Sequence, residues 1–234
     1  MASETMKAKL VVIGGGPGGY VAAIRAAQLG TGVVLVEKNL LGGTCLNWGC
    51  IPTKAILACT EVLDAIREAE AYGISVGEPK PDLKAMVERK EKVSEQLRNG
   101  IAQLLKANKV ELVKGFGRLA APDRVVVETE KGEVTIETEK VIIATKIPPK
   151  TGRWPVLPHE PVSETFPAEW IVQCTEKSLR NLRSDYIDVQ QLHAWTPPYA
   201  EQLEWHEALS RLKEQGKIRA FGISANDWDP YGPV

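Results

Sequence analysis

Residues 10–20 read LVVIGGGPGGY, and this stretch decides the fold. Residues 10–13 are uninterrupted hydrophobic side chains, which is typical of a short buried strand. A glycine-rich turn follows at once, and residues 17–29 then carry a helical pattern that ends at Gly30. A buried strand that runs through a tight turn into a helix predicts an α/β architecture with parallel strand pairing.

The turn itself has the spacing of a phosphate-binding loop. Gly14, Gly16 and Gly19 form a G-x-G-x-x-G pattern, and Glu37 ends the next apolar strand. In this pattern the glycines let the backbone approach a pyrophosphate at the positive end of a helix, and the later carboxylate accepts hydrogen bonds from a ribose. A tight strand–helix turn with a surface glutamate is the alternative. The strand before the turn and the helix after it favour dinucleotide binding.

The composition divides the chain into three segments. Five of the six tryptophans and ten of the fifteen prolines lie after residue 146, and residues 147–167 alone hold six prolines. We therefore expect a nucleotide-binding domain at 1–146, a proline-rich linker at 147–167 and a further unit at 168–234. Beyond the first βαβ unit, the patterning predicts a helix at 44–72 with a disturbance at Pro52, a helix at 82–108, a hairpin of 124–128 with 133–137, and a strand at 141–145. After the linker it predicts a helix at 168–182, a strand at 186–192, a helix ending at Gly216 and a strand at 218–223.

Overall charge and composition exclude several classes of protein. The 29 basic and 30 acidic residues give a net charge of −1, which argues against a nucleic-acid binder held by bulk charge. The apolar runs are far shorter than the roughly 20 residues that a membrane span needs. Four cysteines are too few for a secreted disulfide scaffold of this length. We expect a cytoplasmic protein with neither a nucleic-acid nor a membrane partner.

A second motif follows the nucleotide fingerprint. Residues 42–54 read GGTCLNWGCIPTK, which puts Cys45 and Cys50 near the start of a predicted helix. On a regular helix these side chains point roughly 140° apart, whereas a disulfide needs Cα atoms within about 7 Å. Gly49 and Pro52 are residues that can distort the helix. Two buried structural cysteines are one interpretation, and a redox pair is the other.

These residues give the first 145 positions a resemblance to a known family. GGTCLNWGCIPTK together with the glycine turn resembles the FAD-binding N-terminal part of the dihydrolipoamide dehydrogenases, which are pyridine nucleotide–disulfide oxidoreductases. The resemblance implies that Cys50 lies beside the flavin and that Cys45 exchanges with a lipoyl-type dithiol. It implies a cofactor-binding set of Gly14, Gly16, Gly19, Glu37, Lys38, Gly43, Thr44, Lys54, Gly117 and Thr145.

The remainder of the chain resembles a different family. Residues 174–195, CTEKSLRNLRSDYIDVQQLHAW, and residues 206–224, HEALSRLKEQGKIRAFGIS, are similar to an internal part of the aldo-keto reductases, which reduce carbonyls with NADPH on a (β/α)₈ barrel. The resemblance implies catalytic roles for Lys146 and His193, each at a strand end. It also implies that Ser224 and Asn226 hold the nicotinamide of NAD(P). A solvated lysine and a buried polar core histidine are the alternative interpretations.

Both resemblances are incomplete. Lys146 follows Ala144 and Thr145 where the flavin family continues with Gly-Ser, and the sequence shows no second glycine-rich NAD motif. The catalytic tyrosine and aspartate of the reductases have no matching positions. We therefore expect an α/β fold in which a Rossmann-like FAD-binding domain is followed by a βαβαβ barrel fragment. Because three parallel strands cannot close a barrel, they should extend the first sheet or stay poorly packed.

Three functions remain open from the sequence. The first is an FAD-dependent thiol–disulfide oxidoreductase of the dihydrolipoyl dehydrogenase type, acting on a small-molecule or lipoyl-type thiol. The second is NADPH-dependent carbonyl reduction by an aldo-keto reductase fragment. The third is an inactive chimeric or truncated nucleotide-binding protein. We assign no metal ligands, and the oligomeric state stays open because the dimerisation region of the flavin family is not found.

Overall fold

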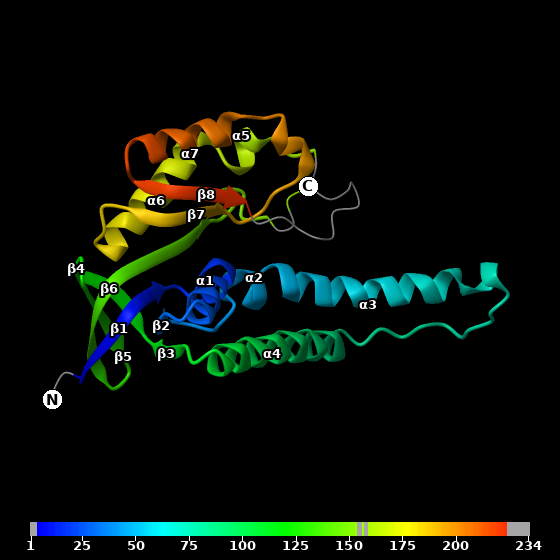
Figure 1. Cartoon of the computed structure of the whole chain (residues 1–234). Coiled ribbons are helices and arrows are strands. Elements are labelled where there is room, and N and C mark those ends of the chain that lie inside the picture. The colour runs from blue at the N-terminus through cyan, green and yellow to red at the C-terminus, as the bar shows by residue number, and fades with distance from the viewer. Residues whose placement is uncertain (1–3, 154–155, 157–158, 224–234) are drawn as a thin grey trace.

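The computed structural model describes residues 4–153, 156 and 159–223, and it is built on one eight-stranded sheet. The main strand order is β3-β2-β1-β6-β5-β4, and β7 and β8 continue the sheet from the end of β6 (Figure 1). The strands are β1 Glu4–Ile13, β2 Val33–Glu37, β3 Glu111–Lys114, β4 Phe116–Ala121, β5 Arg124–Thr129, β6 Gly132–Ile147, β7 Ile187–Leu192 and β8 Ile218–Ile223. The helices are α1 Pro17–Gln28, α2 Gly43–Asn47, α3 Cys50–Glu68, α4 Leu83–Ala107, α5 Val162–Thr165, α6 Ala168–Leu182 and α7 Glu204–Glu214, with short 3₁₀ turns η1 Ala69–Tyr72 and η2 Pro197–Ala200.

The first βαβ unit forms as the sequence predicts. β1 and β2 pair in parallel, from Leu10 opposite Val33 to Ile13 opposite Val36, and α1 makes the crossover between them. The apolar end of β1 and nearly all of β2 are buried. Strands covered on both faces need apolar side chains in both directions, which explains the unbroken hydrophobic runs.

The largest difference from the predicted elements is the length of β6. The sequence predicts a hairpin strand at 133–137 and a separate strand at 141–145, but residues 132–147 form one strand. The predicted hairpin itself is confirmed, because β5 and β6 pair antiparallel around Gly132, whose φ is +124°. β1 is also longer than predicted and pairs in parallel with β6 from Glu4 opposite Val134 onwards. Two of these pairs, Ala8 with Thr138 and Leu10 with Lys140, lie in the stretch between the two predicted strands.

The C-terminal strands extend this sheet, which is one of the two outcomes that the sequence left open. Residues Ala144 to Ile147 of β6 pair in parallel with β7, and β7 pairs in parallel with β8. Figure 1 shows β6 running from the lower part of the molecule into the upper part, where α6 and α7 pack. In the described part of the chain these strands form no closed barrel. The same strand, β6, therefore belongs both to the main sheet and to its extension.

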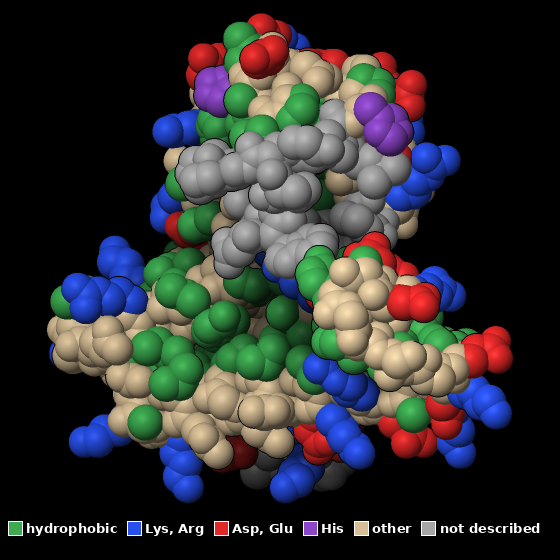
Figure 2. All heavy atoms as spheres, turned by 90° about the vertical axis from the view of Figure 1, so that its right-hand side faces the viewer, with side chains coloured by type: hydrophobic (Ala, Val, Ile, Leu, Met, Phe, Trp, Pro, Cys, Tyr) green, Lys and Arg blue, Asp and Glu red, His purple; other side chains and the backbone are tan. Residues whose placement is uncertain are grey.

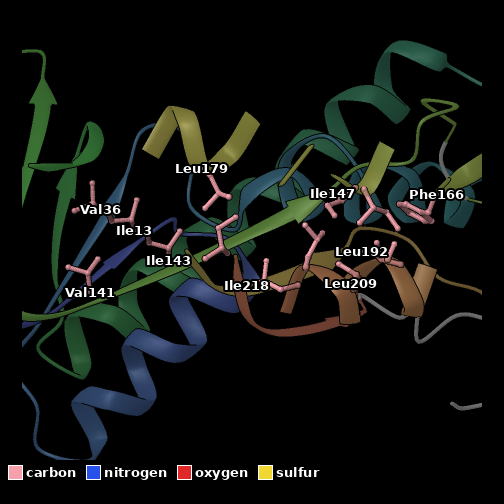
Figure 3. Close-up of a cluster of buried hydrophobic side chains, with 14 of the residues drawn as sticks. Ile13, Val36, Val141, Ile143, Ile147, Phe166, Leu179, Leu192, Leu209 and Ile218 are labelled. Carbon is pink, nitrogen blue, oxygen red and sulfur yellow. The ribbon is translucent and has the colours of Figure 1, made fainter. Parts of the chain in front are cut away.

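One hydrophobic core follows β6 along its length. Ile143 and Ile147 on β6 belong to the same buried cluster as Phe166, Leu192 and Leu209 (Figure 3). These five side chains are at most 1% exposed. A shared, continuous core is what a single folded domain has, so the two parts of the chain pack as one body.

Two long helices form an arm that extends away from the sheet (Figure 1). The predicted helix at 44–72 is divided into α2, α3 and η1, whereas the predicted helix at 82–108 forms as α4. Asp82 caps α4 by accepting a hydrogen bond from the Ala85 N–H at 3.1 Å. Figure 2 views the molecule from the free end of the arm and shows hydrophobic side chains gathered on the lower half of that face. Among the described helices, none has both the length and the apolarity to cross a bilayer.

Candidate functional site

The glycine turn places the amino end of α1 against the end of β6. Gly14 has a φ of +106°, and a Cβ there would lie 3.0 Å from the Ala144 carbonyl oxygen. Gly19 packs directly on the Gly14 carbonyl, so a side chain there has no room. Gly16 caps α1 without any side-chain hydrogen bond. The first turn of α1 thus offers backbone N–H groups and a positive dipole end, as an anion site requires.

A second glycine-rich loop closes onto this turn. The Gly42 N–H donates to the Gly15 carbonyl at 2.8 Å. Gly43 has a φ of +61°, and a Cβ there would lie 2.9 Å from the Gly16 Cα. The Asn47 amide donates to the Leu41 and Gly43 carbonyls, at 2.9 and 2.8 Å, and holds the loop in place. The residues that lead into Cys45 are therefore fixed against the nucleotide turn.

Glu37 stands at the end of β2, where the fingerprint predicts it. Its carboxylate accepts hydrogen bonds from the Gly15 N–H and the Asn39 N–H, both at 2.7 Å. Beside it lies a cavity of about 240 Å³. The cavity is lined by five predicted cofactor residues, Gly14, Glu37, Lys38, Gly117 and Thr145, and by Ser178, Asn181 and Leu182 of α6.

The size and lining of this cavity fit one end of a dinucleotide. Pockets for whole small-molecule ligands begin at roughly 300 Å³, so about 240 Å³ suits a nucleoside portion only. Gly117 lines the cavity without a side chain, and a Cβ at this position would lie only 3.0 Å from Val36 Cγ1. The predicted nucleotide residues therefore converge on a real cavity, and α6 covers it.

The two cysteines come together because the helix that holds them is broken. α2 ends at Asn47 and α3 begins at Cys50, so the break falls at Trp48 and Gly49 rather than at Pro52. Pro52 lies in the first turn of α3, where its missing N–H costs no helical hydrogen bond. The sulfurs of Cys45 and Cys50 lie within 4.8 Å of each other and are free thiols.

The structure also brings the second predicted site to these thiols. In the parallel register of β6 and β7, Lys146 lies opposite Gln191, and the His193 N–H donates to the Ile147 carbonyl at 2.9 Å. An imidazole nitrogen of His193 lies within 4.8 Å of both cysteine sulfurs. A Cβ at Gly49 would lie 3.6 Å from His193 Cε1, so the ring packs beside this glycine. The sequence predicts two separate sites, and the fold joins them.

Electrostatic interactions make the two thiols unequal. A hydrogen bond from the Cys50 thiol lowers the pKa of Cys45, and the His193 hydrogen bond and the Lys146 charge lower it further. The same Cys45–Cys50 hydrogen bond, together with burial, raises the pKa of Cys50. Burial lowers the pKa of Lys146, while the neighbouring Cys45 and Cys50 oppose that shift. Cys45 is thus the sulfur that the site favours as the thiolate, which is the reactive form.

Some predicted residues take no part in this arrangement that the structure describes. Lys54 lies half-buried in α3, one turn after Cys50. Thr44 lies in α2, where its backbone carbonyl accepts a hydrogen bond from the Trp48 N–H at 2.8 Å. Ser224 and Asn226 lie outside the described residues. No sequence pattern pointed to Gln191 on β7, whose Oε1 lies 3.2 Å from where a Gly18 Cβ would be. The α6 residues over the cavity were also missed, because their positions depend on packing.

A larger cavity lies at the opposite end of the strands. It measures about 740 Å³ and is lined by residues from the amino-terminal part of β1 and from the edge at Lys109 and Glu111. In open α/β sheets, ligands bind at the carboxyl ends of the strands. The smaller cavity and the thiol cluster lie at those ends, so they form the candidate site.

The glycine turn and the cysteine pair both lie in a part of the chain that matches a known family. The chain matches the profile of the pyridine nucleotide-disulphide oxidoreductase family over residues 8–162, and it belongs to that family of FAD-dependent flavoproteins. Residues 127–232 match the profile of the aldo/keto reductase family, which uses NADPH. The two matches overlap on β6, the strand that joins the two parts of the sheet.

The chain is similar to several curated dihydrolipoyl dehydrogenases. The chain is 51% identical to that of Zymomonas mobilis over 137 residues, which are 58% of this chain and 29% of the relative. It is 52% identical to that of Manduca sexta over 145 residues, 61% of this chain and 29% of the relative. It is 40% identical to that of Bacillus subtilis over 184 residues, which are 77% of this chain and 38% of the relative. The chain thus spans about a third of the length of these relatives.

Proposed function

We propose that this protein is an FAD-dependent thiol–disulfide oxidoreductase of the dihydrolipoyl dehydrogenase type. The observation that carries the proposal is the placement of Cys45 and Cys50 within 4.8 Å of each other and of His193. The cluster lies at the end of β6, whose preceding residues Ala144 and Thr145 line the nucleotide cavity. The relatives act as dihydrolipoyl dehydrogenases by name, which supports a lipoyl-type substrate.

The cysteine pair can exchange electrons with such a substrate in two balanced steps. Cys45 Sγ attacks one sulfur of a lipoyl disulfide, that S–S bond breaks, and a mixed disulfide forms while the released sulfur takes a proton. Cys50 Sγ then attacks Cys45 Sγ, which forms the Cys45–Cys50 disulfide and releases the substrate as a dithiol. Two electrons pass from the protein to the substrate, and the reverse sequence oxidises a dithiol.

His193 has the position to move the proton of the attacking sulfur. It hydrogen-bonds Cys45, and the thiol–imidazole pairing is a general way of activating a sulfur nucleophile. In the first step the imidazole takes the Cys45 proton and gives it to the departing sulfur. The backbone hydrogen bond of His193 to Ile147 fixes the start of the segment that carries the ring.

The residues present fit the nucleotide portion of FAD. Gly14, Gly16 and the first turn of α1 would hold its pyrophosphate, and Glu37 would hold its ribose, with α6 over the cavity. When bound, the flavin supplies a two-electron acceptor for the dithiol. Lys54, on α3 after Cys50, is the residue that we propose near the flavin ring.

The exchange is tested with the reduced full chain and oxidised lipoamide. We expect the wild-type chain to lose two hydrogens and to yield a Cys45–Cys50 disulfide in peptide mapping. Cys50→Ser should instead accumulate a mixed disulfide on Cys45, because the resolving sulfur is gone. Cys59→Ser is the matched control, since Cys59 lies on α3 apart from the cluster, and it should behave as wild type. A Cys50→Ser chain without an adduct on Cys45 would contradict the exchange.

Flavin binding is tested separately, with FAD added to the purified chain. The expected result is a protein-bound flavin spectrum that survives gel filtration and weakens in Glu37→Ala. A chain that stays colourless after refolding with FAD would refute the flavin part of the proposal. A chain that binds FAD but leaves lipoamide unchanged would support the third sequence hypothesis, a nucleotide-binding protein without turnover.

NADPH-dependent carbonyl reduction is a second candidate, favoured by one observation. The parallel register of β6 and β7 places Lys146 and His193 at neighbouring strand ends, as barrel chemistry requires. The test is turnover of a simple aldehyde with NADPH. Activity that His193→Ala abolishes and His206→Ala preserves would support this candidate, and the absence of turnover by the wild-type chain would end it.

A further inference from the structure

Two soft sulfur ligands and one imidazole nitrogen converge at the end of β6 and β7. The sulfurs of Cys45 and Cys50 and one imidazole nitrogen of His193 all lie within 4.8 Å of one another. Zinc bonds of about 2.3 Å to sulfur and about 2.0 Å to nitrogen, arranged tetrahedrally, separate ligand atoms by roughly 3.5–3.8 Å. The three atoms, at no more than 4.8 Å from one another, are therefore within about 1.3 Å of zinc-ligand separations.

The donor set points to one class of metal. Thiolate and imidazole ligands select Zn²⁺ over the hard cations Mg²⁺ and Ca²⁺, which take oxygen. Two cysteines and one histidine leave the fourth tetrahedral position open, as in zinc sites that bind water or substrate. Cys50 and His193 are buried and Cys45 is half-buried, so the surrounding protein shields the three ligands from bulk water.

The fold holds each of these ligands in place. Cys45 follows the Gly42–Gly43 loop, and Asn47 in the same short helix accepts a hydrogen bond from Arg98 Nη1 at 2.9 Å. Cys50 begins α3, directly after the break in the helix. His193 follows β7, and its ring packs where Gly49 has no side chain. Ligands on three supported segments need little reorganisation when a metal binds.

We propose that the reduced chain binds one Zn²⁺ through Cys45, Cys50 and His193, with the fourth position open to water or to a small thiol. Binding releases the two thiol protons, because the metal takes the thiolate forms. This site goes beyond the proposed redox function and needs neither FAD nor a disulfide substrate. His193 is supplied by the segment that matches the aldo/keto reductase profile, so the site depends on how the two parts of the chain pack.

Metal binding and disulfide formation exclude each other. A Cys45–Cys50 disulfide has no thiolate to give a metal, and a bound metal occupies both sulfurs that the exchange reaction needs. Zinc would therefore inhibit the thiol–disulfide exchange. A small-molecule disulfide that oxidises the two thiolates to the Cys45–Cys50 disulfide, and is itself reduced to two thiols, would release the zinc. The same three residues would switch between a metal-bound and a redox-active state.

The test uses the full chain, reduced, freed of metal with a chelator and titrated with Co²⁺ alone. Cobalt reports its ligands, since thiolate coordination gives intense near-ultraviolet bands and a tetrahedral site gives strong visible bands. We expect saturation at one Co²⁺ per chain and full displacement by Zn²⁺. His193→Ala should weaken binding by more than about 100-fold, because even outer-shell partners of metal ligands contribute 10–100-fold.

Matched controls separate the cluster from other residues of the same types. His206 is exposed on α7 and Cys174 lies on α6, so His206→Ala and Cys174→Ser should bind Co²⁺ as tightly as wild type. Equal affinity in His193→Ala, or a cobalt spectrum without thiolate bands, would overturn the proposal. Circular dichroism of each variant shows whether its fold is intact.

A second measurement needs no variant and covers the case in which His193→Ala fails to fold. Treating the wild-type chain with a small-molecule disulfide, which is reduced to two thiols as the Cys45–Cys50 disulfide forms and is then removed, should abolish the cobalt spectrum. Reduction of the protein disulfide with a phosphine should restore it. An oxidised chain that binds cobalt as the reduced chain does would refute the site. Since FAD and lipoamide are absent from both measurements, the metal proposal can fail or succeed independently of the proposed function.

Discussion

The Asp188 side chain on β7 accepts a hydrogen bond from the Ile143 backbone N–H on β6, with 2.8 Å between Oδ2 and the nitrogen. Ile143 is the last β6 residue paired with β1, and the next residue, Ala144, begins the pairing with β7. The carboxylate therefore satisfies a backbone donor at the point where β6 passes from one partner strand to the other. Its second oxygen accepts from Arg219 Nη1 at 2.8 Å. This contact joins the two parts of the sheet.

Asp188→Ala should lower the free energy of unfolding by about 1–3 kcal/mol, because it leaves the part-buried Ile143 N–H without its acceptor. The Arg219 ion pair adds little, since the Arg219 side chain is 60% exposed. Denaturant unfolding followed by circular dichroism measures the change. Asp185→Ala is the control, because Asp185 is exposed and lies three residues earlier. Equal losses in the two variants would contradict a specific role for Asp188.

Gly43→Ala should destabilise the chain more than Gly73→Ala does. Both glycines have positive φ, +61° and +75°, so both alanines carry a backbone strain of about 1–2 kcal/mol. Only at Gly43 does the new Cβ also meet backbone, 2.9 Å from Gly16 Cα, whereas nothing lies within 4 Å at Gly73. The expected additional loss is about 1–3 kcal/mol, with weaker FAD binding. Equal unfolding midpoints and equal FAD affinity would show that the loop does not need this close approach.

Ser178→Trp should fill the cavity beside Glu37 and reduce FAD retention at least about tenfold. Ser178 lines that cavity from α6, and an indole occupies most of a space of about 240 Å³. Gln173→Trp on the same helix is the control, because Gln173 lies on the other side, toward α7. Flavin absorbance after gel filtration measures the retained cofactor. Undiminished retention in Ser178→Trp would place the nucleotide elsewhere.

Tyr199→Phe should cost about 1 kcal/mol of stability at neutral pH, because the buried hydroxyl donates to Thr165 Oγ1 at 3.0 Å. Burial raises the pKa of Tyr199 above its ordinary value of 10.0. The unfolded chain therefore loses this proton at lower pH than the folded chain, and stability falls as pH rises past about 10. Tyr199→Phe should lessen that alkaline fall.

Tyr72→Phe is the control for this prediction, since Tyr72 is 79% exposed. It should change neither the neutral stability nor its alkaline decline. Unfolding midpoints in denaturant, measured from pH 7 to above pH 10, test both expectations. An alkaline decline of the same slope in Tyr199→Phe and in wild type would show that this residue does not cause it.

The local sequence predicts most of the elements. Unbroken apolar residues specify β1 and β2, and helical spacing specifies α4, because both patterns depend on neighbours along the chain. The continuity of β6 was missed, since it depends on a long partner strand rather than on its own residues. The position of the break between α2 and α3 was predicted in part, because Gly49 was recognised and Pro52 lies within the first turn of α3.

The sequence by itself determined which candidate groups the chain carries: a glycine turn with Glu37, two nearby thiols, and a lysine and a histidine at strand ends. Each of these signals resides in residue types and short spacings. Only the tertiary structure decided that His193 meets Cys45 and Cys50, and that α6 covers the nucleotide cavity. The contacts of His193 with Cys45 and Cys50 join residues more than 100 positions apart, and they arise because β7 pairs with the end of β6. No local pattern encodes such a pairing, since it is fixed by the shared core along that strand.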